Sequence, residues 1–131
     1  MNDTSRDELI RAALEAQTHA FCPYSNFPVG AALRTARGRI FQGVNVENAS
    51  FGLTICAERV AASAAVAAGE REFSEIVVVS RGGVSPCGAC RQFLAEFNPS
   101  LPIVMIDSLE PGVIHKASLA ELLPGRFEGP T

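Results

Sequence analysis

Cysteines stand at the start of two predicted helices, and this pattern limits the folds that the chain can adopt. The first segment is Cys56-Ala57-Glu58, and the second is Pro86-Cys87-Gly88-Ala89-Cys90. We expect Thr54 to cap the first helix and Ser85 the second, with Pro86 at the first helical position, where proline is tolerated best. Each leading cysteine would then be the second helical residue, where unpaired backbone N–H groups and the helix dipole lower the pKa of a thiol.

Three thiolates that meet at two helix ends make a good Zn²⁺ site. Cys87 and Cys90 share one face of their helix, and Cys56 supplies the third ligand once the two helix starts lie together. Catalytic zinc sites keep three protein ligands and an open fourth position. Glu58 can flank an ion off the helix end and move protons to and from water there. Arg59 can hydrogen-bond to the thiolates and withdraw some of their negative charge.

The same cysteines have two plainer interpretations. A structural zinc ion needs a fourth protein ligand, and the candidates are Cys22, which follows a helix, and His19 and His115, which lie far along the chain from the two segments. A redox pair of the thioredoxin type follows the first strand of a βαβ unit, whereas this C-x-x-C lies late in the chain. Cys22 itself is expected to be a small buried apolar residue.

Apolar periodicity predicts helices that alternate with strands. We expect a first helix capped by Asp3 or Ser5 that ends before Pro23, helices over residues 56–68 and 90–97, and a short helix capped by Ser118 that runs to Leu123. The expected strands are residues 29–33, 40–44, 75–80, 103–106 and, weakly, 113–115. The apolar run within 75–80 is typical of a strand buried on both faces. This order predicts a mixed sheet with helices on its faces.

Composition and charge exclude several classes of protein. Hydrophobic residues make up 47% of the chain, charged residues 19%, and the net charge is −3. The chain is too apolar to be disordered and too acidic to hold nucleic acid on a basic face. No apolar stretch approaches the ~20 residues of a membrane-spanning helix, and no secretory signal precedes the first helix. We expect one domain, residues 1–131, in the cytoplasm, without a membrane or nucleic-acid partner.

The cysteine segments and three further blocks resemble the small homotetrameric cytidine deaminases. The further blocks are PYSNFPVGAAL at 23–33, GVNVENASF at 43–51 and ELLPG at 121–125, and the resemblance spans about residues 8–128. It implies an α/β fold, a three-layer α/β/α sandwich with a mixed five-stranded sheet. It also implies one Zn²⁺ per chain, held by Cys56, Cys87 and Cys90. The implied activity is hydrolytic deamination of cytidine and 2′-deoxycytidine to uridine and 2′-deoxyuridine, a step of pyrimidine salvage.

The resemblance implies roles for residues around the substrate. Water activated by zinc attacks C4 of the base while Glu58 protonates N3 and then helps ammonia to leave. Asn45 and Glu47 hydrogen-bond the ribose hydroxyls, Phe27 packs against the base, and the backbone N–H of Ala57 meets the O2 carbonyl. From the residues alone, Phe27 is as readily a core residue, and Asn45 and Glu47 are as readily turn or cap residues.

Two further aromatic residues point to an assembly. The resemblance implies that Phe51 and Phe127 complete the pocket of a neighbouring subunit, which makes the homotetramer a condition for activity. The expected partners are therefore a free pyrimidine nucleoside and further copies of the chain.

Four alternative functions differ from this one in substrate or in class. Deaminases of blasticidin S share the zinc motif but generally lack the intact Asn-x-Glu-Asn run found at 45–48. A nucleotide deaminase needs phosphate donors beside the sugar, where Glu47 places a carboxylate. A polynucleotide deaminase needs a larger basic surface than the cluster Arg34, Arg37 and Arg39, which lies in a hairpin turn. A non-catalytic zinc module that binds a partner remains open, and it would not depend on Glu58.

Overall fold

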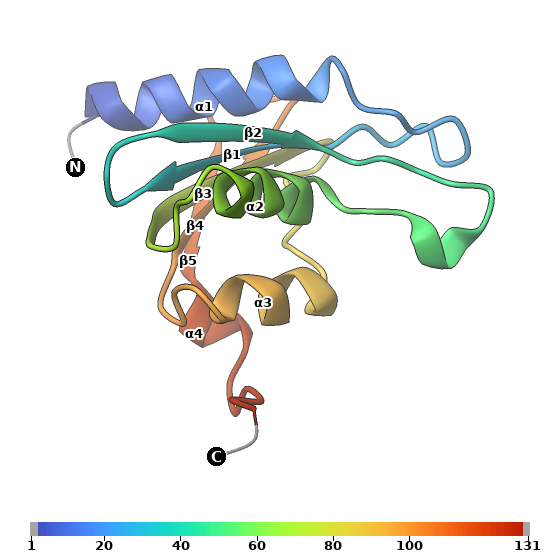
Figure 1. The fold of residues 1–131 in the computed structure, drawn as a ribbon. Coiled ribbons are helices and arrows are strands. Elements are labelled where there is room, and N and C mark those ends of the chain that lie inside the picture. The colour runs from blue at the N-terminus through green and yellow to red at the C-terminus, as the bar shows by residue number, and fades with distance from the viewer. Residues whose placement is uncertain (1–2, 130–131) are drawn as a thin grey trace.

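The computed structural model describes residues 3–129, which fold around one mixed sheet (Figure 1). The order of the five strands is β2-β1-β3-β4-β5. Their bounds are β1 Gly30–Thr35, β2 Ile40–Val44, β3 Phe73–Ser80, β4 Pro102–Asp107 and β5 Ile114–Ser118. β3 and β4 run parallel, and every other neighbouring pair is antiparallel. The mixed five-stranded sheet that the sequence predicts is confirmed.

Helices cover both faces of this sheet and complete the expected three-layer α/β/α sandwich (Figure 1). Their bounds are α1 Asp3–Gln17, η1 Phe51–Leu53, α2 Ala57–Ala67, α3 Gly88–Ala95 and α4 Leu119–Leu122, where η1 is a 3₁₀ turn. α1 packs on one face, and α2, α3 and α4 pack on the other. No helix in the described part of the chain is both long and apolar enough to span a lipid bilayer.

β3 shows why the fold needs both helix layers. Val77 and Val79 belong to the apolar cluster under α1, whereas Ile76 and Val78 belong to the cluster under α2 and α3. All four side chains are buried. Successive side chains of a strand point to opposite faces, so a continuous apolar run requires cover on both sides, as the sequence predicts.

Two glycines let the helices approach the strand backbones closely. A Cβ atom on Gly30 would lie 2.2 Å from the carbonyl oxygen of Ala13 in α1, and one on Gly43 would lie 2.2 Å from that of Ala57 in α2. Only a residue without a side chain fits at either contact. The first residue of α2 is therefore fixed directly against β2.

The ends of several elements differ from the expectation. α1 already contains Asp3 and Ser5, so neither is its N-cap. β5 extends to Ser118 because it pairs with β4 along its whole length, a long-range contact that local pattern does not reveal. Ser118 is confirmed as the cap of α4, where it forms a reciprocal capping box with Glu121.

Candidate active site

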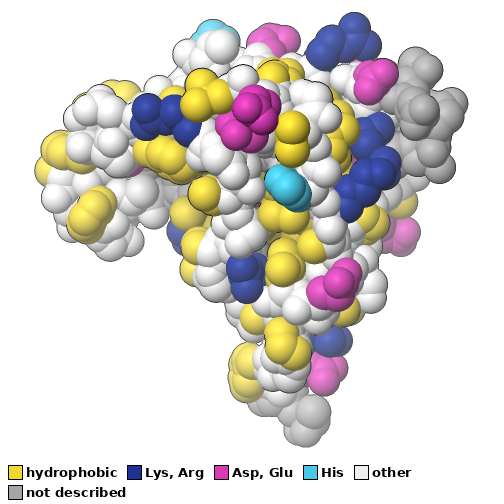
Figure 2. Space-filling view, turned by 180° about the vertical axis from the view of Figure 1, so that it is seen from behind, with side chains coloured by type: hydrophobic (Ala, Val, Ile, Leu, Met, Phe, Trp, Pro, Cys, Tyr) yellow, Lys and Arg dark blue, Asp and Glu magenta, His cyan; other side chains and the backbone are white. Residues whose placement is uncertain are grey.

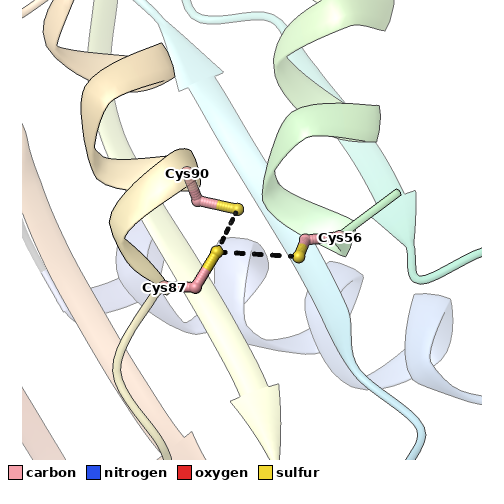
Figure 3. Close-up of side chains that lie close together, drawn as sticks. All are labelled: Cys56, Cys87 and Cys90. Carbon is pink, nitrogen blue, oxygen red and sulfur yellow. Dashed lines mark hydrogen bonds between the residues drawn. The ribbon is translucent and has the colours of Figure 1, made fainter. Parts of the chain in front are cut away.

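The three cysteines expected to bind zinc lie together at the N-terminal ends of α2 and α3 (Figure 3). The Sγ atom of Cys87 is 3.8 Å from that of Cys56 and 3.5 Å from that of Cys90. All three sulfurs lie within 4.8 Å of one another. The fold thus brings together two segments that stand 31 residues apart in the chain.

Cys56 and Cys87 are themselves the N-caps of their helices, not the second helical residues as expected. The hydroxyl of Thr54 accepts a hydrogen bond from a backbone N–H in the preceding loop, and that of Ser85 accepts one from the guanidinium of Arg91. Both predicted caps are therefore wrong, because these oxygens are engaged elsewhere and each helix begins later. Neither cysteine makes a side-chain hydrogen bond to the first turn of its helix. Each sulfur is therefore available to bind an ion beyond the helix end.

This donor set fits a zinc ion. Zn–S bonds of about 2.3 Å at tetrahedral angles place sulfurs about 3.8 Å apart, which matches the spacing around Cys87. The pKa of Cys56 is lowered to about 5, chiefly because the Cys90 thiol is hydrogen-bonded to it and also because Arg59 is nearby. The same bond and burial raise the pKa of Cys90. A divalent cation favours ionisation of all three thiols together.

Glu58 and Arg59 follow Cys56 in the first turn of α2 and flank the sulfurs differently. Glu58 is only 4% exposed, and burial raises the pKa of its carboxyl to about 6, with the nearby charge of Cys56 adding to the effect. The Nη2 atom of Arg59 donates to Cys56 Sγ at 3.6 Å, as the sequence analysis expected. Its Nε atom is buried without a hydrogen-bond partner in the described structure.

A cavity of about 200 Å³ opens beside this cluster. Cys56, Glu58 and Cys87 lie at one part of its wall. The remaining wall is mostly apolar and comes from β3, the first residue of α2 and the loops before β1, α2 and α3, namely from Val29, Asn45, Thr54, Ala57, Val78, Val84 and Ser85. The cavity therefore combines a buried carboxyl and the thiols of Cys56 and Cys87 with a surface suited to a flat, largely apolar ring.

Asn45 lines the cavity and also fixes its rim. Its Oδ1 atom accepts a hydrogen bond from the backbone N–H of Val29 at 3.0 Å, and its Nδ2 atom donates to the carbonyl of Phe27 at 2.9 Å. The side chain is buried. The interpretation of Asn45 as a loop-organising residue is consistent with these bonds, and one amide hydrogen remains for a further acceptor.

Glu47 and Phe27 are not among the residues that line the cavity. The Glu47 carboxylate accepts hydrogen bonds from the backbone N–H groups of Tyr24 and Ser25, at 3.0 and 3.1 Å, and from the Ser25 hydroxyl. The hydroxyl contributes most to a lowered pKa of Glu47. Phe27 is half-buried in the same loop, and the guanidinium of Arg81 covers its ring.

The two aromatic residues assigned to a neighbouring subunit lie away from the cavity of their own chain. Phe51 is 79% exposed and Phe127 is 71% exposed. Cys22 is partly exposed and lies outside the thiol cluster. The expectation that Cys22 is a small buried apolar residue is wrong, because it stands in the loop after α1 and not beneath a helix or strand.

Comparisons with known proteins agree with this geometry. The family model described as the cytidine and deoxycytidylate deaminase zinc-binding region matches residues 3–106. The chain belongs to this family. The expected membership is confirmed, and the zinc-binding region of this member contains the cluster of Cys56, Cys87 and Cys90.

Three relatives illustrate how far the likeness to other family members extends. The cytidine deaminase of Sporosarcina psychrophila is 46% identical over 124 residues, 92% of this chain and 90% of that protein. The crystal structure of cytidine deaminase from Burkholderia pseudomallei superposes with a TM-score of 0.88 at 46% identity, over 97% of this chain and 100% of that one. The blasticidin-S deaminase of Bacillus cereus is 33% identical over 130 residues, 92% of this chain and 90% of that protein.

Apart from Asn45, sequence reasoning did not place in the site the cavity residues that lie outside the two cysteine segments. Val84 and Ser85 come from the loop between β3 and α3, Val78 comes from β3, and Val29 directly precedes β1. The available signal was position, because loops at the carboxyl ends of parallel strands carry binding residues in α/β proteins. Arg81, in the same loop, was also missed, since nothing near it in sequence indicates its contact with Phe27.

Proposed function

We propose that this family member catalyses the zinc-dependent hydrolytic deamination of cytidine and 2′-deoxycytidine to uridine and 2′-deoxyuridine. The observation that carries the proposal is the buried carboxyl of Glu58 beside three convergent thiols, at the wall of a cavity with mostly apolar sides. When bound, zinc supplies activation of a water molecule for attack on C4 of the base.

Glu58 has the position that a proton shuttle needs. The reaction adds water to the C4=N3 unit and then expels ammonia, so one group must take a proton from water, place it on N3 and later protonate the leaving nitrogen. Glu58 is buried at the cavity wall beside Cys56. A buried carboxyl exchanges protons with the substrate and not with bulk solvent, which supports this role.

Other groups in and around the cavity can hydrogen-bond the O2 carbonyl of the base and the ribose hydroxyls. Ala57 begins α2, so its backbone N–H has no partner within the helix and is available to the O2 carbonyl. The free amide hydrogen of Asn45 is available to a ribose hydroxyl. Glu47 holds the turn at Tyr24 and Ser25, and we assign it to the sugar side. A carboxylate there favours a nucleoside over a nucleotide, because it repels phosphate.

The Glu58→Gln variant tests this proposal. We expect it to keep one zinc per chain, measured by atomic absorption, and to lose conversion of cytidine by about 10²–10⁴-fold, the usual contribution of general acid–base catalysis. The control is Glu8→Gln, because Glu8 is exposed on α1. Loss of the cytidine absorbance band gives the rate. Release of ammonia by Glu58→Gln at near the parent rate would show that the assigned mechanism is wrong.

A panel of substrates separates the proposal from its alternatives. We expect conversion of cytidine and 2′-deoxycytidine, and little conversion of the corresponding monophosphates or of blasticidin S. Preferential turnover of blasticidin S would instead assign the chain to that branch of its relatives. Binding of zinc without turnover of any cytosine compound would favour a non-catalytic zinc module.

We further propose that residues 1–131 form one catalytic domain that assembles as a homotetramer in the cytoplasm. Exposed apolar side chains gather on the lobe formed by the loops after α1 and β2 (Figure 2). They are Phe21, Tyr24, Val46, Phe51, Leu53 and Ile55. Such a patch is typical of an interface, and Phe51 lies within it for donation to a neighbouring pocket. The four cysteines are free thiols, which the cytoplasm keeps reduced.

A further inference from the structure

Arg81 joins two loops that border the cavity. It follows β3, and its guanidinium lies over the ring of Phe27, with Cζ 5.4 Å from the ring centre. The same guanidinium donates a hydrogen bond to the backbone carbonyl of Asn26, 55 residues away in the chain. One side chain thus contacts both an aromatic ring and the peptide group directly before it.

The backbone N–H and carbonyl groups of Phe27 are also hydrogen-bonded. The N–H of Phe27 donates to the Ser25 hydroxyl at 3.1 Å, and its carbonyl accepts from Asn45. Asn26 has φ of 54°, in the left-handed region that costs free energy for a residue other than glycine. The bond from Arg81 stabilises the peptide of this turn, which sets the direction in which Phe27 leaves it.

The loop that carries Arg81 is itself ordered. The Ser80 hydroxyl accepts a hydrogen bond from the N–H of Val84 at 3.1 Å, and the Asp107 carboxylate accepts one from the N–H of Gly82 at 3.0 Å. Gly82 has φ of 86°, which glycine adopts without strain. Arg81 therefore extends from a fixed turn, and Val84 at the end of this turn lines the cavity.

We propose that Arg81 is a positioning residue for substrate binding, which holds Phe27 in the orientation that packs against the pyrimidine base. The inference rests on the proposed function and on the contact between Phe27 and the base that the resemblance to cytidine deaminases implies. Phe27 stands in the same loop as Val29, which lines the cavity. A cation over an aromatic ring is attracted to its electron-rich face. Arginine suits this position because its planar guanidinium can stack on the ring and donate a hydrogen bond at the same time. The ammonium group of lysine is a point charge that cannot stack in this way.

Kinetics of Arg81→Ala and Arg81→Lys test this role. Since Phe27 contacts the base before and during the reaction alike, losing its support raises KM and leaves kcat nearly unchanged. We expect Arg81→Ala to raise the KM for cytidine about three- to ten-fold with kcat within about two-fold, and Arg81→Lys to lie between this variant and the parent. The control is Arg71→Ala, because Arg71 bonds the backbone carbonyls of Val66 and Glu70.

A double-mutant cycle with Phe27→Ala then shows whether Arg81 acts through the ring. If it does, Arg81→Ala has little further effect on KM in the Phe27→Ala background, whereas independent actions multiply. An unchanged KM in Arg81→Ala, or the same penalty with and without the Phe27 ring, would overturn the role of Arg81 alone. A parent protein that does not deaminate cytidine would overturn the proposed function and this role with it.

Discussion

Single atoms decide whether the ends of α2 and α3 can hold an ion. The sulfurs of Cys56, Cys87 and Cys90 converge, whereas the sulfur of Cys22 stands apart in a loop. A hydroxyl is a far weaker zinc ligand than a thiolate, because it stays protonated at neutral pH. A Cys-to-Ser substitution therefore distinguishes the three proposed ligands from Cys22, because it removes the thiolate with almost no change in the shape of the side chain.

We expect Cys87→Ser to lower zinc content at least about ten-fold, because it leaves two thiolates at the cluster. Cys22→Ser is the matched control and should keep one zinc per chain. Atomic absorption on protein with reduced thiols gives both values. Equal zinc in the two variants would remove Cys87 from the ligand set.

At this scale, the residues that sequence predicts well are those whose chemistry is local. The spacing of Cys56, Ala57 and Glu58 can be read from the sequence, whereas the N-cap of their helix is Cys56 and not Thr54 as predicted. The partners of Glu47 and Phe27 are different. They depend on Ser25 and Arg81, which meet them only after the chain has folded, so no local pattern could have indicated them.

Helices and strands position the site residues through close backbone contacts, and these contacts leave almost no room for an added side chain. α2 lies so close to β2 that a Cβ atom on Gly43 would be 2.2 Å from the carbonyl oxygen of Ala57 and 2.5 Å from the N atom of Ala61. Both are backbone atoms, so no side-chain rotation relieves the clash. The helix must shift, and the residues at its start shift with it.

We expect Gly43→Ala to destabilise the protein by about 2–3 kcal/mol, as overpacking of a tight contact does, and to lower kcat/KM at least about ten-fold, since misplaced catalytic groups lose rate steeply. Gly112→Ala is the control, because nothing lies within 4 Å of its Cβ position. Urea unfolding and cytidine kinetics measure the two effects. Parent-like values for Gly43→Ala would contradict the close packing of α2 on β2.

The segment after α2 is joined to the β1–β2 turn by charge. Glu70 is buried, and its carboxylate lies 3.4 Å from Arg37 and 3.2 Å from Arg39. Its pKa is lowered, chiefly by a hydrogen bond with Thr35 and then by Arg37. A carboxyl whose pKa is lower in the folded protein stabilises the fold above its ordinary pKa of about 4.5 and loses this contribution as the pH falls through the lowered value.

We therefore expect Glu70→Gln to be less stable than the parent at about pH 7, and the gap between them to narrow below about pH 4. Glu72→Gln is the control, because Glu72 is exposed two residues further on. Urea midpoints at the two pH values test the sign. A gap that widens in acid would mean that the carboxylate does not stabilise the fold.

Element type was predictable from sequence, and element order in the sheet was not. The apolar run of β3 is a local signal, and the structure confirms that this strand is buried on both faces. The position of β3 between β1 and β4 depends on which strands pair across the sheet. The extent of β5 has the same cause, since its partner is β4.

As a whole, the molecule has an uneven surface. The lobe of exposed apolar residues around Phe51 projects from one end of the sheet (Figures 1 and 2). Phe127 lies exposed after α4. Aromatic side chains contribute large buried areas to interfaces, so the proposed homotetramer is expected to depend on them.

We expect the parent protein to be a tetramer by light scattering and Phe51→Ala to weaken both the tetramer and the turnover of cytidine. Leu109→Ala is the control, since Leu109 is equally apolar and 73% exposed but lies in the turn after β4. Full activity from a monomer at the assay concentration would contradict the shared pocket.

The thiol cluster has a second consequence, which concerns the stability of the chain. An ion held by Cys56 and Cys87 would join positions 31 residues apart. Such a site exists only once α2 and α3 lie together, so zinc would bind the folded chain in preference to the unfolded one. Free zinc at about 100 times its dissociation constant would then stabilise the fold by about 2.7 kcal/mol, and its removal would lower the free energy of unfolding as well as the reaction rate.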